Sequence, residues 1–83
     1  SYWTSYNNLG LLYGKLGNKS KTLEVFEQLI LLIPESKKGR FPSYGNYLNS
    51  LAYAYFELGR DSESEIVFKK ALDFYEQYYG KGA

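Results

Sequence analysis

Two asparagines 42 positions apart, Asn7 and Asn49, are well placed for recognition chemistry. A carboxamide donates and accepts hydrogen bonds, so it can hold the backbone of an extended peptide without demanding a particular sequence. Leu11 follows Asn7 by four residues, and Tyr53 and Phe56 follow Asn49 by four and seven, so each set would share one face of a helix. The two aromatic side chains offer apolar area at low entropic cost, which suits an anchor at an interface.

The chain has few residues that are suited to catalysis or to metal binding. Its 83 residues include no His and no Cys, which removes the commonest general base, the commonest metal ligand and all thiolate chemistry. Glu63 and Glu65 would point to different sides of a helix, and the three glycines of residues 10–17 fall in a helical pattern, not in a phosphate-binding loop. We therefore expect no enzyme, no metal site and no cofactor.

The overall charge and hydropathy exclude other classes of partner. A formal net charge of +1 gives no electrostatic reason to bind nucleic acid or an anionic membrane. The basic cluster of Lys37, Lys38 and Arg40 is better read as a solvated loop than as a phosphate or acidic-peptide site. The longest apolar run, Leu29–Ile33, is far too short to span a bilayer, and no signal peptide is visible, so we expect a cytoplasmic protein.

An internal repeat organises the chain. When residues 6–26 are aligned with residues 48–68, eight of the pairs are identical: Asn7 and Asn49, Leu9 and Leu51, Tyr13 and Tyr55, Leu16 and Leu58, Gly17 and Gly59, Ser20 and Ser62, Val25 and Val67, and Phe26 and Phe68. A repeat of this length indicates one supersecondary unit stacked on a copy of itself.

Helical spacing of the apolar residues predicts the four elements that position these side chains, over residues 6–16, 20–33, 43–58 and about 61–79. Gly17 and Gly59 would end the first and third helices, and Pro34 would end the second. Ser62 and Glu65 would form a capping box at the start of the fourth. The connection inside each pair is short, so each pair must form an antiparallel hairpin.

The repeated residues follow a known signature, Trp-x2-Leu-Gly-x2-Tyr, then Ala-x3-Phe, then Pro. The first copy has Tyr6, Leu9, Gly10, Tyr13, Thr22, Phe26 and Pro34 at these positions, and the second has Leu48, Leu51, Ala52, Tyr55, Ser64, Phe68 and Glu76. The chain therefore resembles the tetratricopeptide repeat over nearly its whole length. Its period of 42, against the common value of about 34, resembles the long repeats of kinesin light chains and of bacterial signalling arrays.

The resemblance implies an all-α fold of two stacked antiparallel helix hairpins, which is a segment of a right-handed α-solenoid. It divides a single domain, residues 1–83, into a first repeat at about 3–36, a linker at about 37–44 and a second repeat at about 45–79. Small residues at Gly10 and Ala52 would let the helices approach, and Phe26 and Phe68 would fill the space between hairpins. Solenoids normally need three or more repeats, so we expect the chain to be a piece of a longer array.

The resemblance also implies a concave groove, lined by the first helix of each hairpin, that binds a peptide or a partner protein. The expected binding residues are Asn7, Asn8, Leu11, Lys15, Asn46, Asn49, Tyr53 and Phe56. Only Lys15 among them is cationic, which argues against the carboxylate clamp known in this family.

Two other functions remain open at this point. The chain could be a structural spacer or an oligomerisation segment, or the sensor domain of a peptide-responsive regulator. Self-association is expected through aromatic side chains near the end of the fourth helix: Phe74, Tyr75, Tyr78 and Tyr79.

Overall fold

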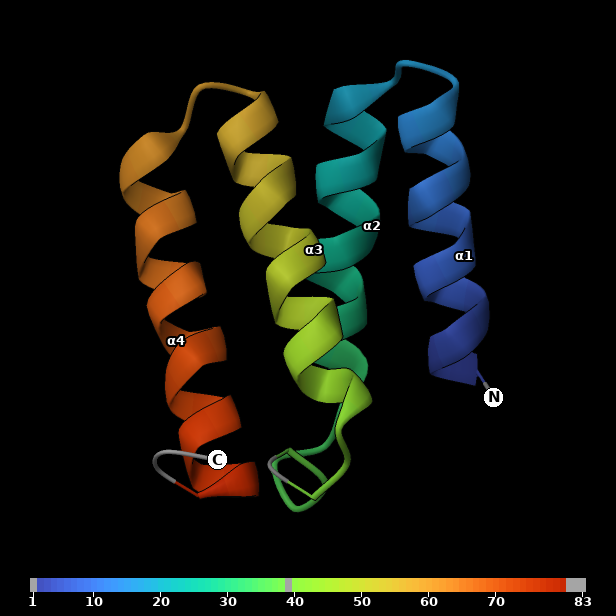
Figure 1. Cartoon of the computed structure of the whole chain (residues 1–83). Coiled ribbons are helices and arrows are strands. Elements are labelled where there is room, and N and C mark those ends of the chain that lie inside the picture. Colours follow the sequence, from blue (N-terminus) through green and yellow to red (C-terminus); the bar gives the residue numbers. More distant parts are fainter. Residues whose placement is uncertain (1, 39, 81–83) are drawn as a thin grey trace.

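The computed structural model of the chain describes residues 2–38 and 40–80, and the elements in them are four α-helices. They are α1 (Tyr2–Lys15), α2 (Lys19–Leu32), α3 (Ser43–Glu57) and α4 (Asp61–Tyr79). The helices α1 and α2 form one antiparallel hairpin, α3 and α4 form a second, and α2 packs against α3 where the hairpins meet (Figure 1). The predicted all-α fold of stacked hairpins is confirmed.

Each hairpin turns at a glycine with left-handed backbone geometry. Gly17 has a φ of 80° and Gly59 a φ of 76°, a conformation that costs glycine little because it has no Cβ. The residue after each glycine donates its backbone N–H to a carbonyl of the last helical turn, Asn18 to Tyr13 at 2.9 Å and Arg60 to Tyr55 at 2.9 Å. These bonds satisfy carbonyls that the helix end would otherwise leave unpaired.

Small residues and hydroxyl groups hold the two helices of each hairpin together. The Thr22 hydroxyl donates to the carbonyl oxygen of Gly10 at 3.3 Å, and the Ser64 hydroxyl donates to that of Ala52 at 2.8 Å. A Cβ on Gly10 would lie only 2.8 Å from Cζ of Phe26, so the close approach requires glycine there. The spacing of the repeat signature thus corresponds to the same interhelical contact, formed twice.

One hydrophobic core runs through both hairpins. The helix α2 contributes Leu23, Phe26 and Leu29, and α3 contributes Leu48, Leu51 and Tyr55. The Tyr55 hydroxyl crosses between the hairpins and donates to Oε2 of Glu27 at 2.7 Å. Burial, together with this hydrogen bond, raises the pKa of Tyr55 to about 12.

Two local details differ from the sequence prediction. The first helix begins at Tyr2, earlier than expected, so its first turn includes Trp3. The ring of Trp3 stacks on that of Phe41 in the linker, with 5.2 Å between the ring centroids. The predicted capping box at Ser62 is wrong: α4 begins at Asp61, and its N-cap residue Arg60 makes no side-chain cap bond. The Arg60 guanidinium instead donates twice to the Glu63 carboxylate, both times at 2.7 Å.

Several apolar residues of the repeat lie on the surface, including Phe68, which was expected to fill the space between hairpins. Leu9, Leu16 and Phe68 are exposed, because each faces an outer side of the stack where no further hairpin packs within the described chain. In the apolar run at the end of α2, Leu29 is buried but Leu31 is 75% exposed.

The expected cluster of exposed aromatics on α4 is also smaller than predicted. Phe74 is buried, with its ring 5.4 Å from that of Tyr44 of α3 in an edge-on arrangement. Tyr75 is partly buried, whereas Tyr78 and Tyr79 remain exposed as expected.

Candidate binding groove

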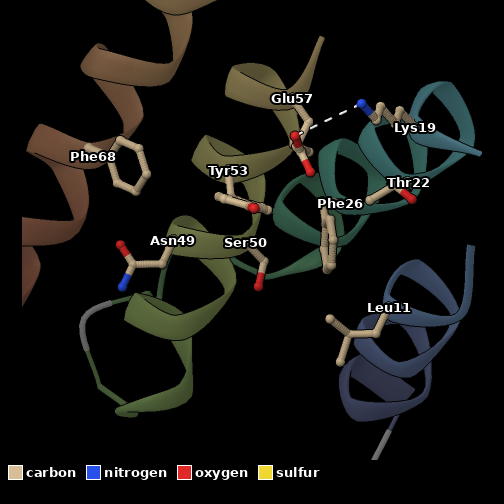
Figure 2. Close-up of a pocket in the computed structure, with 10 residues that line it drawn as sticks. Leu11, Lys19, Thr22, Phe26, Asn49, Ser50, Tyr53, Glu57 and Phe68 are labelled. Carbon is tan, nitrogen blue, oxygen red and sulfur yellow. Dashed lines mark ion pairs between the residues drawn. The ribbon is translucent and has the colours of Figure 1, made fainter. Parts of the chain in front are cut away.

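A cavity of about 390 Å³ lies along α3 and is open to one face of the hairpin stack (Figure 2). All four helices contribute to it. The lining residues are Leu11 of α1, Lys19, Thr22 and Phe26 of α2, Asn49, Ser50, Tyr53, Ala54 and Glu57 of α3, and Phe68 of α4. We call this cavity the groove.

The groove has an apolar wall that continues from one hairpin to the next. Phe26 is buried within the stack, while Leu11 and Tyr53 are about half exposed, at 49% and 57%. Figure 2 shows Leu11 and Phe68 toward opposite ends, with Tyr53 and Phe26 between them. Leu11 and Tyr53 occupy equivalent positions of the repeat, 42 residues apart, so the second copy extends the apolar surface of the first.

Polar groups at the groove differ in whether they are free to bind. The Thr22 hydroxyl is within hydrogen-bond distance of two carbonyl oxygens, 3.3 Å from that of Gly10 and 3.0 Å from that of Asn18. The side chains of Asn49 and Ser50 make no hydrogen bond within the described part of the chain. The Asn49 amide is therefore available to donate to, and accept from, a bound backbone.

An ion pair lies at the edge of the groove, where α2 begins and α3 ends. Nζ of Lys19 is 3.9 Å from Oε2 of Glu57, and both side chains are partly exposed (Figure 2). The start of α2 meets the end of α3 here because successive helices run in opposite directions (Figure 1). The two charges cancel, so the groove itself exerts little net attraction on a charged ligand.

Three of the eight predicted binding residues, Leu11, Asn49 and Tyr53, line the groove together. Asn7, Asn8 and Lys15 lie on α1 outside its lining, and the only cationic side chain in the lining is Lys19. Lys19 was missed because only the first helix of each hairpin was considered, although the antiparallel arrangement brings the first turn of α2 beside it.

The other two predicted residues belong to the surface between α3 and α4. Oδ1 of Asn46 accepts a hydrogen bond from the Tyr75 hydroxyl at 2.8 Å. Phe56 lines a second cavity, of about 380 Å³, together with Phe68 and Leu72. The groove residues that sequence analysis did not identify are Lys19, Thr22, Phe26, Ser50, Ala54 and Phe68.

Three other features of the sequence concern the basic cluster, metal binding and membrane insertion. Nζ of Lys38, in the basic cluster, pairs with Oε1 of Glu35 at 2.8 Å, which fits a solvated loop. In residues 2–38 and 40–80, no three His, Cys, Asp or Glu side chains are grouped so that they could hold a metal ion. None of the described helices has the length and hydropathy needed to cross a bilayer.

Comparison with known protein families gives the chain its identity. Two family models, both described as tetratricopeptide repeat, match it, one over residues 4–36 and the other over residues 45–82. A search of curated proteins and a search of solved structures each found no match. The first model covers the α1–α2 hairpin and the second covers the α3–α4 hairpin. With both hairpins matched, the chain belongs to the tetratricopeptide-repeat family.

Proposed function

We propose that the groove binds an extended segment of a partner protein, with an apolar side chain of that segment inserted between Leu11 and Tyr53. The observation that carries this proposal is the apolar groove of about 390 Å³ with the unpaired amide of Asn49 beside it. Tetratricopeptide repeats generally mediate interactions between proteins, which favours the same class of function.

The residues of the groove define the chemistry of the preferred partner. An inserted Leu, Ile or Phe side chain would bury apolar surface against Leu11, Phe26 and Tyr53, at about 25 cal/mol per Å². Asn49 would hold the partner backbone without selecting a sequence. Because Lys19 and Glu57 neutralise each other, we expect selection for apolar anchors and not for acidic or basic segments.

Other parts of the functional hypothesis stay predictions. These are the roles of Asn7, Asn8, Lys15, Asn46 and Phe56, the division into repeats at about 3–36 and 45–79, the likeness to the long repeats of kinesin light chains and bacterial signalling arrays, and the cytoplasmic location. The absence of catalysis is an expectation that the family favours. The spacer and the peptide-responsive sensor remain alternatives, and no feature of the groove favours either.

A peptide-display selection tests the proposal. Random 12-residue peptides would be selected on the 83-residue chain, and the affinities of the recovered peptides would be measured for Asn49→Ala and Tyr53→Ala. Each change should weaken binding by about 1–2 kcal/mol, or about five- to thirty-fold, because it removes a backbone-holding amide or an aromatic anchor. Neither should shift the melting temperature much, since both side chains are at least partly exposed.

Leu31→Ala is the matched control, because Leu31 is exposed on α2 and does not line the groove. It should leave peptide affinity unchanged. Recovered peptides that bind Asn49→Ala and Tyr53→Ala as tightly as the unmodified chain would refute the groove assignment. A large loss of stability in either variant would show instead that these residues support the fold.

A further inference from the structure

One side of α1 carries an exposed apolar stripe formed by Leu9, Leu12 and Leu16. Leu12 is 52% exposed and Leu16 is 71% exposed, although the stripe lies on a helix of a packed hairpin. The equivalent residues of α3, 42 positions later, are Leu51, Ala54 and Leu58. Leu51 and Ala54 are buried, and Leu58 packs against the core. The exposed side of α1 is thus equivalent, in the repeat, to one particular side of α3. That side of α3 is buried between the two hairpins.

The opposite end of the stack has a complementary surface. Phe68 and Leu72 of α4, with Phe56 of α3, line the cavity of about 380 Å³. Phe68 and Leu72 are equivalent to Phe26 and Ile30 of α2, which pack into the core beside α3. The α1–α2 hairpin uses this surface to receive α3. On the α3–α4 hairpin, no other described residue of the chain covers the equivalent surface.

The charges at the two ends also match. Inside the chain, Lys19 of the receiving hairpin pairs with Glu57 of the incoming helix at 3.9 Å. Their equivalents at a junction between two copies are Asp61 of the receiving hairpin and Lys15 of the incoming helix. The signs are exchanged, and the pair remains opposite in charge.

We infer that a second copy of this chain docks its α1 on the α3–α4 end of the first copy, in the way that α3 packs on the first hairpin. Copies then associate head to tail. The observations that select this occupant are the continuity with the internal interface and the preserved charge pair. The association uses the two ends of the stack and goes beyond peptide binding in the groove.

One substitution makes the junction weaker than the internal interface. Glu65 lines the receiving cavity where the first hairpin has the buried Leu23. A docked helix would partly desolvate this carboxylate, which disfavours binding. The contact should therefore be reversible and concentration-dependent. A head-to-tail contact of this kind leaves a free end on each added copy, so it does not close at a dimer.

Sedimentation velocity of the 83-residue chain and of two variants tests the assignment. The unmodified chain should give species that grow with concentration beyond a dimer. Leu12→Glu removes the docking stripe, and Leu72→Glu removes the receiving surface. Each variant alone should associate at least about thirty-fold more weakly, because it places a charge at the centre of the contact. Mixed together, they should form a 1:1 complex of unmodified affinity that grows no further, because one intact end of each kind remains.

Leu31→Glu is the control, since Leu31 is equally apolar, is exposed and lies outside both ends. It should associate like the unmodified chain. A chain that stays monomeric at every concentration overturns the inference, as does a Leu12→Glu or Leu72→Glu variant that still associates alone. That last result would indicate a symmetric contact instead.

Two further changes test the junction without introducing a charge into an apolar site. Lys15→Glu or Asp61→Lys alone should weaken association by about three- to five-fold, and the two together in one chain should restore it. Glu65→Leu, which introduces the residue of the internal interface, should tighten association by about ten-fold. The proposed docking geometry would be contradicted if neither Lys15→Glu nor Asp61→Lys weakened association. It would also be contradicted if the Glu65→Leu chain associated no more tightly than the unmodified chain.

Discussion

Two glycines one turn apart on α1, Gly10 and Gly14, have different surroundings. A Cβ on Gly10 would lie 2.8 Å from Cζ of Phe26, whose ring is buried and cannot move freely. A Cβ on Gly14 would meet only Oγ1 of Thr22, at an ordinary 3.7 Å. The same residue type therefore serves close packing at one position and has no packing role at the other.

We expect Gly10→Ala to lower the free energy of unfolding by about 1–2 kcal/mol, because overpacking of about 1–3 kcal/mol exceeds the gain in helix propensity. Gly14→Ala should raise it by about 0.5–1 kcal/mol. Urea unfolding of both variants measures the difference. Equal effects of the two substitutions would show that the Phe26 ring does not constrain Gly10.

The hydrogen bond from Tyr55 to Glu27 gives the stability an alkaline limit. An unfolded tyrosine ionises near pH 10, whereas burial and Glu27 raise the pKa of Tyr55 to about 12 in the folded chain. The folded state therefore holds this proton more tightly, and the associated stability is present below about pH 10 and is lost as the pH rises through about 12.

Tyr55→Phe should accordingly be less stable than the unmodified chain by about 1 kcal/mol at neutral pH, because it removes the hydrogen bond to a carboxylate that water can still reach. The difference should shrink above about pH 10. Urea unfolding of the two proteins at a series of pH values checks this. A difference that stays constant into the alkaline range would mean that the phenol proton is not linked to folding.

At the scale of the helices, burial depends on what packs against each repeated face. Phe26 of α2 and Phe68 of α4 are equivalent in the repeat, yet they are 2% and 42% exposed. The helix α3 covers Phe26, whereas within the described chain nothing packs on the outer side of Phe68.

Phe26→Ala should therefore cost about 3–5 kcal/mol of stability, as expected for deletion of a fully buried aromatic side chain. Phe68→Ala, with much less surface to lose, should cost about 1 kcal/mol. Thermal unfolding at a concentration where the chain is monomeric compares them. Similar losses would mean that the packing of α3 on α2 contributes little to stability.

At the scale of the whole molecule, the shared core links the two hairpins into one folding unit. The core includes Leu23 and Phe26 on one side of the junction and Leu51 and Tyr55 on the other. If one hairpin unfolded, the core surface of the other hairpin would be exposed to water. The chain should therefore unfold in one cooperative transition.

The single tryptophan makes this testable. Trp3 stacks on Phe41 at 5.2 Å, so its fluorescence reports on the first hairpin and the linker, whereas far-ultraviolet circular dichroism reports on all four helices. The two signals should change together with urea concentration. A fluorescence transition that precedes the loss of helix would show that the hairpins unfold separately.

The sequence alone was enough to predict the helices and their pairing. Apolar spacing follows the 3.6-residue helical period, and Gly17 and Gly59 have the left-handed geometry that ends a helix, so these features are local. The eight identities between the two copies then implied that the hairpins are equivalent and stacked. Leu11, Asn49 and Tyr53 were expected at a groove because the family resemblance places one along the first helix of each hairpin. They line the cavity in the structure, and their role in binding stays a prediction.

Only the tertiary structure decided which apolar residues are buried and which side chains meet. Phe26 and Phe68 are identical in type and in repeat position, so no local pattern separates the buried ring from the exposed one. Lys19 lies close to Glu57 because the antiparallel order of the helices brings the start of α2 beside the end of α3. Hydrophobic periodicity does not predict a contact between residues so far apart in the sequence. Whether a side chain is buried depends on what packs against its helix face. At the two ends of the stack, the tertiary structure decides this and the local sequence does not.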